Sequence, residues 1–494
     1  MNTLILFPFQ LNIRYIEHSN IKFDDVMIMD HISFYKRHPY HKKRIALHRS
    51  AIMHFIDEHQ HTYPIKHVWI ESLDRFYNTY NHPHTYMYLP NDQQDVNFIK
   101  PLDHIHLLDD PLYIVSREEW KQLLSKKPWK MDTIYRQLRM KHHILMDGDM
   151  PLGGKYSFDG DNRKPFKKGL QFHEPITFES DDITTSAIDW TNALFSDHPG
   201  TLDHLQVPVN RTQALQSLDH FIYYRLASFG DHQDVMMIGQ PFMSHALLSS
   251  SLNLGLITPK EVIDKAEKAY HEGLCEFHHV EGFIRQILGW REYIRGVYLH
   301  TPDYHMKNAF HHHVPLPSFY WNAKTELSCL SHTIHETIEY SYNHHIQRLM
   351  ILSNYANLIG VNPIELNDWF NSMYMDAFDW VVTPNVMGMG LYADGGLMST
   401  KPYISGASYI NKMSNYCESC KYDPTIKTGE KACPFNALYW HFIDNHQETL
   451  RKNPRMSMMV NLHDKMNPEL KEHYRSEALT HIDNTKKIIA SDIL

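Results

Sequence analysis

The sequence predicts an α/β domain built on a doubly wound parallel sheet, followed by a larger all-α domain. Three observations predict this class. Short apolar runs alternate with a helical pattern in the first third of the chain, glycines and prolines then interrupt the pattern, and helical periodicity dominates from about residue 211. We therefore divide the 494 residues into an α/β domain (1–146), an interdomain connection (147–210) and a helical domain (211–494).

Four apolar runs in the first domain are expected to form strands. They cover residues 4–9, 25–29, 68–70 and 104–108, and a stretch with apolar residues at helical spacing, 42–58, lies between the second and the third. Runs that are buried on both faces and separated by helices are typical of a parallel sheet. No glycine-rich loop follows the first run, so the sequence does not indicate a dinucleotide site there.

The connection is rich in glycine and proline and contains a short basic segment. Its four cationic residues are Arg163, Lys164, Lys167 and Lys168. A charge run of this kind is most often a solvated loop. The alternative is a loop that contacts the phosphates of a nucleic acid.

The second half of the chain carries apolar residues at helical spacing. The pattern is clearest over 281–300 and recurs over 262–270, 335–358 and 437–450. Strand signals are nearly absent here, and no internal repeat or low-complexity tract is found. This part of the chain is therefore expected to be helical throughout.

Composition and charge narrow the function classes. Hydrophobic residues make up 43% of the chain and charged residues 21%, which is an ordinary globular balance. The formal net charge of −9 argues against a protein that coats nucleic acid nonspecifically, although it leaves room for a local basic face. The N-terminus has no basic segment before its apolar run, and no 18-residue apolar stretch occurs, so we expect a cytoplasmic protein without a membrane span.

Three of the five cysteines form a constellation typical of a metal centre. Cys417 and Cys420 make a CxxC pair, and Cys433 follows after twelve intervening residues, directly before a proline. A closed four-thiolate site needs one more ligand, and the residues leave Cys275 and Cys329 as candidates. Four thiolates suit zinc or an iron–sulfur cluster, and the alternative is that these cysteines are buried small hydrophobic residues.

Three segments make the chain recognisable. Residues 416–456, which hold these cysteines, residues 280–293 (Val-Glu-Gly-Phe-Ile-Arg-Gln-Ile-Leu-Gly-Trp-Arg-Glu-Tyr) and residues 385–403 resemble the iron–sulfur bacterial branch of the cryptochrome/photolyase family. The resemblance implies an antenna-type α/β domain, a helical FAD-binding domain and a 4Fe-4S cluster. It also implies that Cys329 is the fourth cluster ligand and that Cys275 is not a ligand.

The resemblance assigns residues to the flavin. His245 to Ser249 resembles the turn that binds the FAD phosphates, and Arg291 and Arg348 match arginines near the flavin and its phosphates. Asp376 matches the side chain that faces flavin N5. A run of the form Gly-x-Gly at 388–390 follows no predicted strand, so it is not interpreted as a dinucleotide fingerprint.

Further matches concern light-driven DNA repair. His345 matches the histidine that protonates the lesion in (6-4) photolyases, His344 precedes it, and Tyr403 matches a tyrosine near the lesion pocket. A histidine titrates in the range that such a general acid needs. The resemblance thus implies an enzyme that acts on (6-4) photoproducts in UV-damaged DNA, and we expect it to be a monomer. The alternatives are a blue-light photoreceptor of the same fold and, from another class, a structural iron–sulfur or zinc protein that binds nucleic acid.

Two parts of the chain depart from the family pattern. Trp369 and Trp321 match electron-transfer positions, but Phe370 stands where the branch has a tyrosine, and phenylalanine is not readily oxidised. The branch also carries a Gly-Asp-Gln-Leu turn whose aspartate helps to bind a lumazine antenna. Here residues 7–11 read Phe-Pro-Phe-Gln-Leu, while Asp30 matches an acidic residue that lines the same pocket. The sequence leaves the binding of a lumazine-type antenna open.

Overall fold

The first domain is built on a five-stranded parallel sheet. The computed structural model describes residues 1–203 and 205–491. The strands are β1 (Thr3–Leu6), β2 (Asp25–Asp30), β3 (Ile65–Trp69), β4 (Thr85–Tyr88) and β5 (His106–Leu108), in the order β3-β2-β1-β4-β5. The parallel sheet is therefore confirmed. The strand β4 was not predicted, because its four residues are too few to give a clear periodicity.

The strand order reverses between β1 and β4, so a crevice opens there at the carboxyl ends of the strands. Helix α2 (Lys42–His59) confirms the predicted helix within one residue. The other helical segments of this domain are α1 (Arg14–Glu17), η1 (Ile32–Phe34), α3 (Leu73–Tyr80), α4 (Gln93–Ile99), α5 (Arg117–Leu123) and α6 (Met131–His142).

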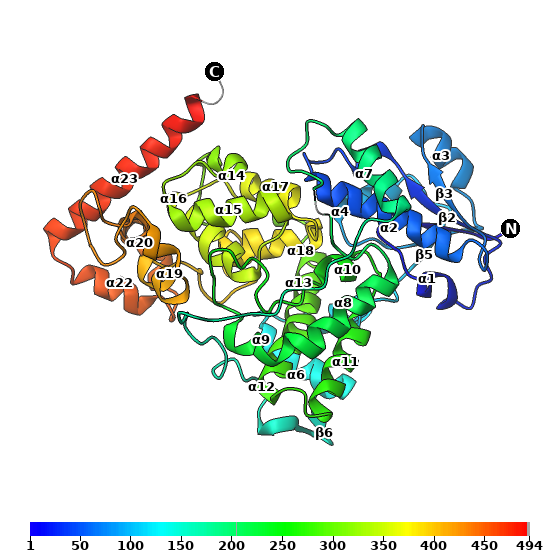
Figure 1. Ribbon diagram of the computed structural model, residues 1–494, viewed down its shortest axis with the longest axis horizontal. Coiled ribbons are helices and arrows are strands. Elements are labelled where there is room, and N and C mark those ends of the chain that lie inside the picture. The colour runs from blue at the N-terminus through cyan, green and yellow to red at the C-terminus, as the bar shows by residue number, and fades with distance from the viewer. Residues whose placement is uncertain (204, 492–494) are drawn as a thin grey trace.

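The predicted interdomain connection contains a helix that was not predicted from the sequence. After the β6–β7 hairpin (Met146–Asp147, Met150–Pro151) and the turn η2 (Leu152–Gly154), the chain reaches α7 (Asp182–Leu194), which packs against α2 (Figure 1). The side chains that α7 buries are Thr184, Ala187 and Thr191. Such small residues give little hydrophobic signal, which explains why this helix was missed.

The helical domain begins with α8 (Arg211–Tyr224), α9 (Leu226–His232), α10 (Ser249–Asn253) and α11 (Pro259–His271). Next comes a continuous rod, formed by α12 (Phe277–Ile284), the π-helical segment η3 (Arg285–Arg291) and α13 (Glu292–Leu299). The prediction of one helix over 281–300 thus holds, with a π-helical turn inside it. The remaining elements are η4 (Tyr304–Met306), α14 (Phe319–Asn322), α15 (Ser328–Tyr340), η5 (Gln347–Ser353), α16 (Asn354–Ile359), α17 (Pro363–Met373), α18 (Asp379–Thr383), η6 (Pro384–Gly390), α19 (Ala407–Met413), η7 (Tyr416–Ser419), α20 (Pro434–Asn445), α21 (Gln447–Arg451), α22 (Ser457–Asp464) and α23 (Pro468–Ser491).

One predicted helix is broken, and the break matters for the site. The pattern over 335–358 predicted a single helix, but α15 ends at Ser341, whose φ of 54° is left-handed. The Ser341 hydroxyl donates to the carbonyl of Met373, 2.8 Å away, which holds this turn in place. The chain then runs as a strap over 342–344, and His345 and Ile346 form the helical turn that leads into η5. A helical pattern cannot reveal such a break, because the residues on both sides keep their spacing.

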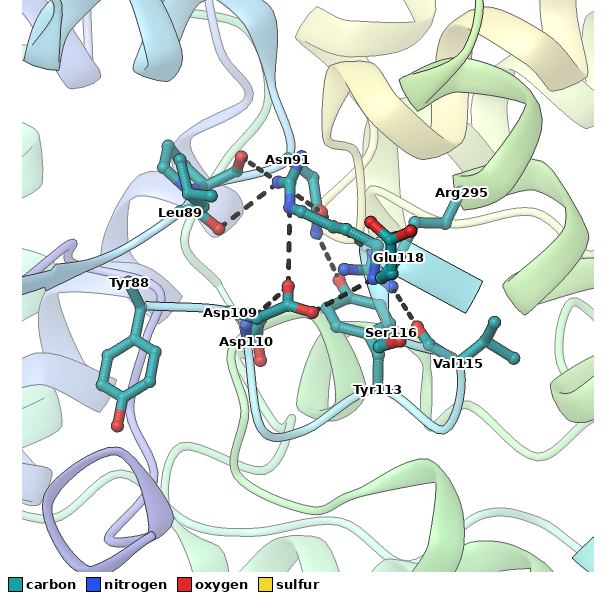
Figure 2. A network of polar contacts seen from close by, with 12 residues as sticks. Tyr88, Leu89, Asn91, Asp109, Asp110, Tyr113, Val115, Ser116, Glu118 and Arg295 are labelled. Atoms are coloured by element: carbon teal, nitrogen blue, oxygen red, sulfur yellow. Dashed lines mark hydrogen bonds and ion pairs between the residues drawn. The ribbon is translucent and has the colours of Figure 1, made fainter. Parts of the chain in front are cut away.

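Polar contacts fasten the two domains together. Arg295 on α13 is fully buried and donates to the side chain of Asn91 (3.0 Å) and the carbonyl of Val115 (2.7 Å), as Figure 2 shows. Asn91 in turn donates to the hydroxyl of Tyr113 at 2.9 Å. The loops that follow β4 and β5 are therefore bound to the helical domain. In the described part of the chain, every helix is too short or too polar to cross a membrane.

Candidate functional site

The helical domain encloses a cavity with an empty volume of about 1550 Å³ that opens to solvent. Residues of the π-helical segments η3, η5 and η6 line it, together with the strap 342–344, the following His345 and the turn 245–249. π-Helical turns inside longer helices are frequent at functional sites. Seven predicted site residues converge on this wall: His245, Ser249, Arg291, His344, His345, Arg348 and Asp376.

The centre of the cavity wall is an ion pair. The two terminal nitrogens of Arg348 lie 3.1 and 3.2 Å from the Asp376 carboxylate, and the Ser249 hydroxyl donates to the same carboxylate at 2.7 Å. The guanidinium also lies 4.0 Å from the ring centre of Tyr374. The Arg348 side chain is thereby held on both faces, and it presents a fixed positive charge to anything in the cavity.

Two neighbouring histidines on the wall lack hydrogen-bond partners. His344 and His245 stack at 4.5 Å with an interplanar angle of 9°, and both are buried. Both ring nitrogens of His344 and Nε2 of His245 have no partner among the described residues. Burial, with neighbouring positive groups, lowers the pKa of both imidazoles well below its ordinary value, so both rings are neutral near pH 7. Buried polar atoms without partners at a cavity wall indicate that a ligand supplies the missing hydrogen bonds.

His345 is exposed, unlike the two buried histidines. Its side chain is 47% exposed, and its Nε2 lies 3.5 Å from the carboxylate of Asp234. Its ring centre is 5.6 Å from that of His245, so the exposed histidine stands beside the buried pair. The strap and the turn that follows it thus place one imidazole in the wall and the next at the open edge of the cavity.

The basic loop reaches this edge, but its charges are unequal. Arg163 pairs with Asp159 and lies 3.6 Å from Asp234, and Lys164 pairs with Asp231 at 2.6 Å. Lys167 and Lys168 are exposed, and neither forms an ion pair with a described residue. Only the second half of the loop therefore carries uncompensated positive charge.

Tyr403 is not part of the cavity wall. Burial raises the pKa of its hydroxyl, and the charges of Arg455 and Arg163 act in the opposite direction. Tyr403 is thus close to the basic loop. Its predicted place near a lesion stays a prediction.

The predicted electron-transfer tryptophans lie behind the cavity. Trp369 is fully buried, with its ring centre 5.2 Å from that of Phe370, which lines the cavity. Trp321 is 41% exposed.

Four of the five cysteines meet in a separate cavity of about 290 Å³. They are Cys329, Cys417, Cys420 and Cys433, whereas Cys275 lies elsewhere. The wall between them is apolar and includes Leu327, Ile410 and Tyr416. Burial raises the pKa of the Cys329 thiol, and the other three cysteines raise it further, because four thiolates cannot share a dry site without a cation. The donor set and its surroundings thus fit a metal centre bound by four thiolates.

The crevice at the sheet edge is largely filled. Phe9 stacks on Phe7 and packs edge-on against Phe378, both at 5.3 Å, and it separates two chambers of about 560 and 480 Å³. Asp30 does not line either chamber. Its carboxylate is fully buried and accepts hydrogen bonds from Tyr35 (3.1 Å), Arg49 (3.3 Å) and His67 (3.0 Å). The match of Asp30 to an acidic residue of an antenna pocket stays a prediction.

A parallel sheet domain joined to a helical domain that holds a largely apolar cavity with several charged and imidazole side chains, and a four-cysteine centre, is the architecture of a two-domain cofactor protein. A family profile described as "Deoxyribodipyrimidine photo-lyase-related protein" matches residues 4–207. A (6-4) photolyase of Agrobacterium fabrum is 42% identical over 376 residues, which are 76% of this chain and 74% of that protein. The chain belongs to the cryptochrome/photolyase family.

Solved structures agree on the fold. A bacterial class III photolyase from Agrobacterium tumefaciens superposes with a TM-score of 0.56 at 14% identity, over 98% of each chain. The cryptochrome of Synechocystis superposes with a TM-score of 0.54 at 11% identity, over 79% of this chain and 82% of that one.

Proposed function

We propose that this protein is a light-dependent DNA repair enzyme that reverts (6-4) pyrimidine photoproducts. The single observation that carries the proposal is the convergence of seven family-matched residues on one cavity that contains unpartnered buried imidazoles. The similarity to a (6-4) photolyase over three quarters of the chain supports the lesion class.

The cavity fits FAD by the chemistry of its wall. Arg348 and Arg291 offer positive charge, and the buried Nε of Arg291 has no partner. Ser249 offers a hydroxyl at the start of α10, and apolar side chains such as Ile287 and Val386 surround these groups. When bound, FAD supplies the light-driven electron that the lesion needs. The chain's own task is to hold it, to exclude water and to provide the proton. The role of Asp376 opposite flavin N5 remains a proposal, and its carboxylate is at present engaged by Arg348 and Ser249.

His345 is proposed as the proton donor because it is exposed at the cavity edge and lies beside a carboxylate. Nε2 of His345 lies 3.5 Å from the carboxylate of Asp234, whose negative charge can pair with the protonated imidazole at this edge. A flipped nucleotide that enters from the surface meets His345 before it meets the buried pair His245 and His344. His345 then transfers a proton to the lesion as a general acid.

We also propose that Cys329, Cys417, Cys420 and Cys433 bind a 4Fe-4S cluster, and their convergence in one apolar cavity supports this. Iron and sulfide analysis of the purified protein tests it. Cys329→Ala is expected to lose the iron, whereas Cys275→Ala, the matched control outside the cavity, keeps it. The reverse result contradicts the assignment.

The test of function is direct. The purified protein is irradiated with blue light in the presence of DNA containing one (6-4) photoproduct, and lesion loss is followed. We expect repair of this lesion and much slower loss of a cyclobutane dimer. A protein that binds flavin but repairs neither lesion supports the photoreceptor alternative, and a protein without flavin contradicts both.

A further inference from the structure

Helix α8 ends in two exposed tyrosines that do not line the proposed flavin cavity. The side chains of Tyr223 and Tyr224 are 63% and 55% exposed. Two histidines flank the second tyrosine: the ring centre of Tyr224 lies 4.7 Å from that of His220 and 5.8 Å from that of His173. We call these four side chains the aromatic patch. Large apolar side chains that are exposed together, rather than singly, indicate a binding surface.

The basic loop leads directly to the aromatic patch. Burial lowers the pKa of His232, and the nearby charge of Lys167 lowers it further. The His232 ring centre lies 5.7 Å from that of Phe172, and the next residue of the loop, His173, contacts Tyr224. The chain therefore runs from the unpaired cations of the basic loop, across α9, to the exposed tyrosines of α8, which is next to α9 (Figure 1).

The acidic side chains of this surface are engaged elsewhere. Segments 163–174 and 219–232 contain three of them. Asp219 pairs with Lys265, and Asp231 pairs with Lys164. Glu174 interacts electrostatically with the buried arginine that follows the tyrosines. The free charge beside the aromatic patch is therefore positive.

The aromatic patch is also fixed relative to the cavity. Arg225, which directly follows Tyr224, is 1% exposed and donates to the backbone carbonyl of His245 at 2.7 Å. His245 belongs to the cavity wall. The end of α8 is thus bonded to the turn 245–249, and a strand that crosses the basic loop can reach both the cavity edge and the tyrosines.

We propose that the basic loop and the aromatic patch bind single-stranded DNA, with Lys167 and Lys168 on its phosphates and Tyr223 and Tyr224 stacked on its bases. Uncompensated cations beside exposed aromatic rings are the usual composition of a surface that binds single strands. Bases inside a duplex already stack on one another, so the tyrosines favour unpaired DNA. This inference deepens the proposed function and rests on it, because it takes DNA as the partner.

The experiment measures binding of the full chain to an undamaged, fluorescently labelled oligothymidine and to a duplex of the same length. Fluorescence anisotropy across a salt series gives the affinity and its salt dependence. Three double variants are compared with the wild type: Tyr223→Ala/Tyr224→Ala, Tyr223→Phe/Tyr224→Phe, which keeps both rings, and Lys167→Ala/Lys168→Ala. Thermal unfolding and sedimentation of each variant report its folded state and its oligomeric state.

We expect the alanine variant of the tyrosines to bind the single strand at least about fivefold more weakly, because stacking on even one base contributes that much. Its salt slope and its affinity for the duplex should stay near the wild type, and the phenylalanine variant should retain most of the affinity. The lysine variant should instead lower the salt slope on the single strand by roughly 1.4, at about 0.7 per phosphate.

Wild-type affinity of the alanine variant for the single strand overturns the inference, as does an equal loss on the duplex or an equal loss in the phenylalanine variant. A wild-type dimer that the alanine variant converts to a monomer also overturns it, because the patch then binds a second copy of the chain. The probes carry no lesion, so the proposed function is tested separately by repair of (6-4) DNA. Stacking by the tyrosines without repair contradicts only the proposed function, and repair without stacking contradicts only this inference.

Discussion

The segment 376–379 separates two concave regions with opposite properties. On one side, Asp376 and Ala377 line the cavity of the helical domain, and on the other, Phe378 and Asp379 line the crevice at the sheet edge. The cavity keeps unpartnered imidazoles and an open volume of about 1550 Å³. The crevice is divided by Phe9 into two chambers of about a third of that size.

The charges on the two sides also differ in how they are satisfied. In the crevice, the Arg37 guanidinium pairs at 2.6 Å with Asp95, whose side chain is 1% exposed. Asp92, beside them, accepts hydrogen bonds from the backbone N–H groups of Asp379 and Trp380 at the start of α18. Asp92 thus joins the two domains and the Arg37–Asp95 pair lies within the α/β domain, whereas His245 and His344 on the cavity wall leave ring nitrogens without partners among the described residues. The proposed flavin site therefore lies on one side of this segment and a contact between the domains on the other.

The largest expected effect is a loss of repair activity without a loss of flavin, on substitution of His345. His345→Ala should keep flavin but lower the repair rate by roughly 10²–10⁴-fold, the usual contribution of a general acid. His344→Ala should do less harm to repair, because this ring lies in the wall. Lesion loss under blue light and the flavin absorbance of each variant measure the two effects. Repair at the wild-type rate by His345→Ala would remove this residue from the mechanism.

The next prediction compares the ion pairs on the two sides of segment 376–379. Arg348→Ala and Arg37→Ala each strand a largely buried carboxylate, so each should lower the free energy of unfolding by about 3 kcal/mol. Only Arg348→Ala should also lose flavin. Urea denaturation and flavin titration are the two measurements. Equal loss of flavin in Arg37→Ala would show that the crevice takes part in binding and would break the comparison.

A third prediction uses two buried histidines. His41, in the α/β domain, is fully satisfied: its Nδ1 accepts from the backbone N–H of Lys43 and its Nε2 bonds the carbonyl of Ile338. Neither ring nitrogen of His344 has a hydrogen-bond partner among the described residues. His41→Phe should therefore cost about 1–3 kcal/mol of stability, whereas His344→Phe should be nearly neutral in flavin-free protein. Thermal unfolding with and without flavin decides between these outcomes.

The same two residues contribute to the pH dependence of stability. Burial lowers the pKa of His41 to about 4 and that of His344 well below 6.5, while the unfolded chain titrates near 6.5. Below pH 6.5 the unfolded state binds more protons, so stability falls as the pH falls, by up to about 1.4 kcal/mol per pH unit for each histidine. The His344→Phe variant should lose one such contribution. An unchanged slope of stability against pH between 4.5 and 6.5 contradicts the assignment of a neutral His344.

These contrasts show which features a sequence can reveal. The cysteine cavity was predictable, because a CxxC pair fixes two ligands locally and the family resemblance supplies the remote Cys329. The predicted residues of the cavity wall were found through the same family resemblance. The filling of the crevice by Phe9 was not, since it depends on contact with Phe378, which lies more than 300 residues away.

Local sequence patterns gave incomplete predictions where tertiary contacts determine the local structure. The left-handed Ser341 interrupts a helical pattern through its bond to Met373, and α7 is held by small residues that carry almost no signal. Asp30 was matched by resemblance to a pocket residue, and the three neighbouring donors that hold its carboxylate in the domain interior were not predicted. In each case the deciding contacts are tertiary contacts between separate elements, which a local pattern does not record.

The smallest expected effect concerns the basic loop at the open edge of the cavity. From the sequence alone, all four cations of the loop were predicted to contact phosphates equally. In the structure, however, Arg163 and Lys164 are already paired with Asp159, Asp234 and Asp231. A paired cation releases fewer counterions when it meets a phosphate, so Lys167 and Lys168 should supply most of the loop's contribution to DNA binding.

The double variant Lys167→Ala/Lys168→Ala should lower the slope of log affinity against log salt by roughly 1.8, at about 0.9 per phosphate contact. The matched variant Lys164→Ala should lower it by clearly less than 0.9, and both should act equally on damaged and undamaged DNA. Fluorescence anisotropy across a salt series measures these slopes, and a larger change in Lys164→Ala than in the double variant would show that the ion pairs open when DNA binds.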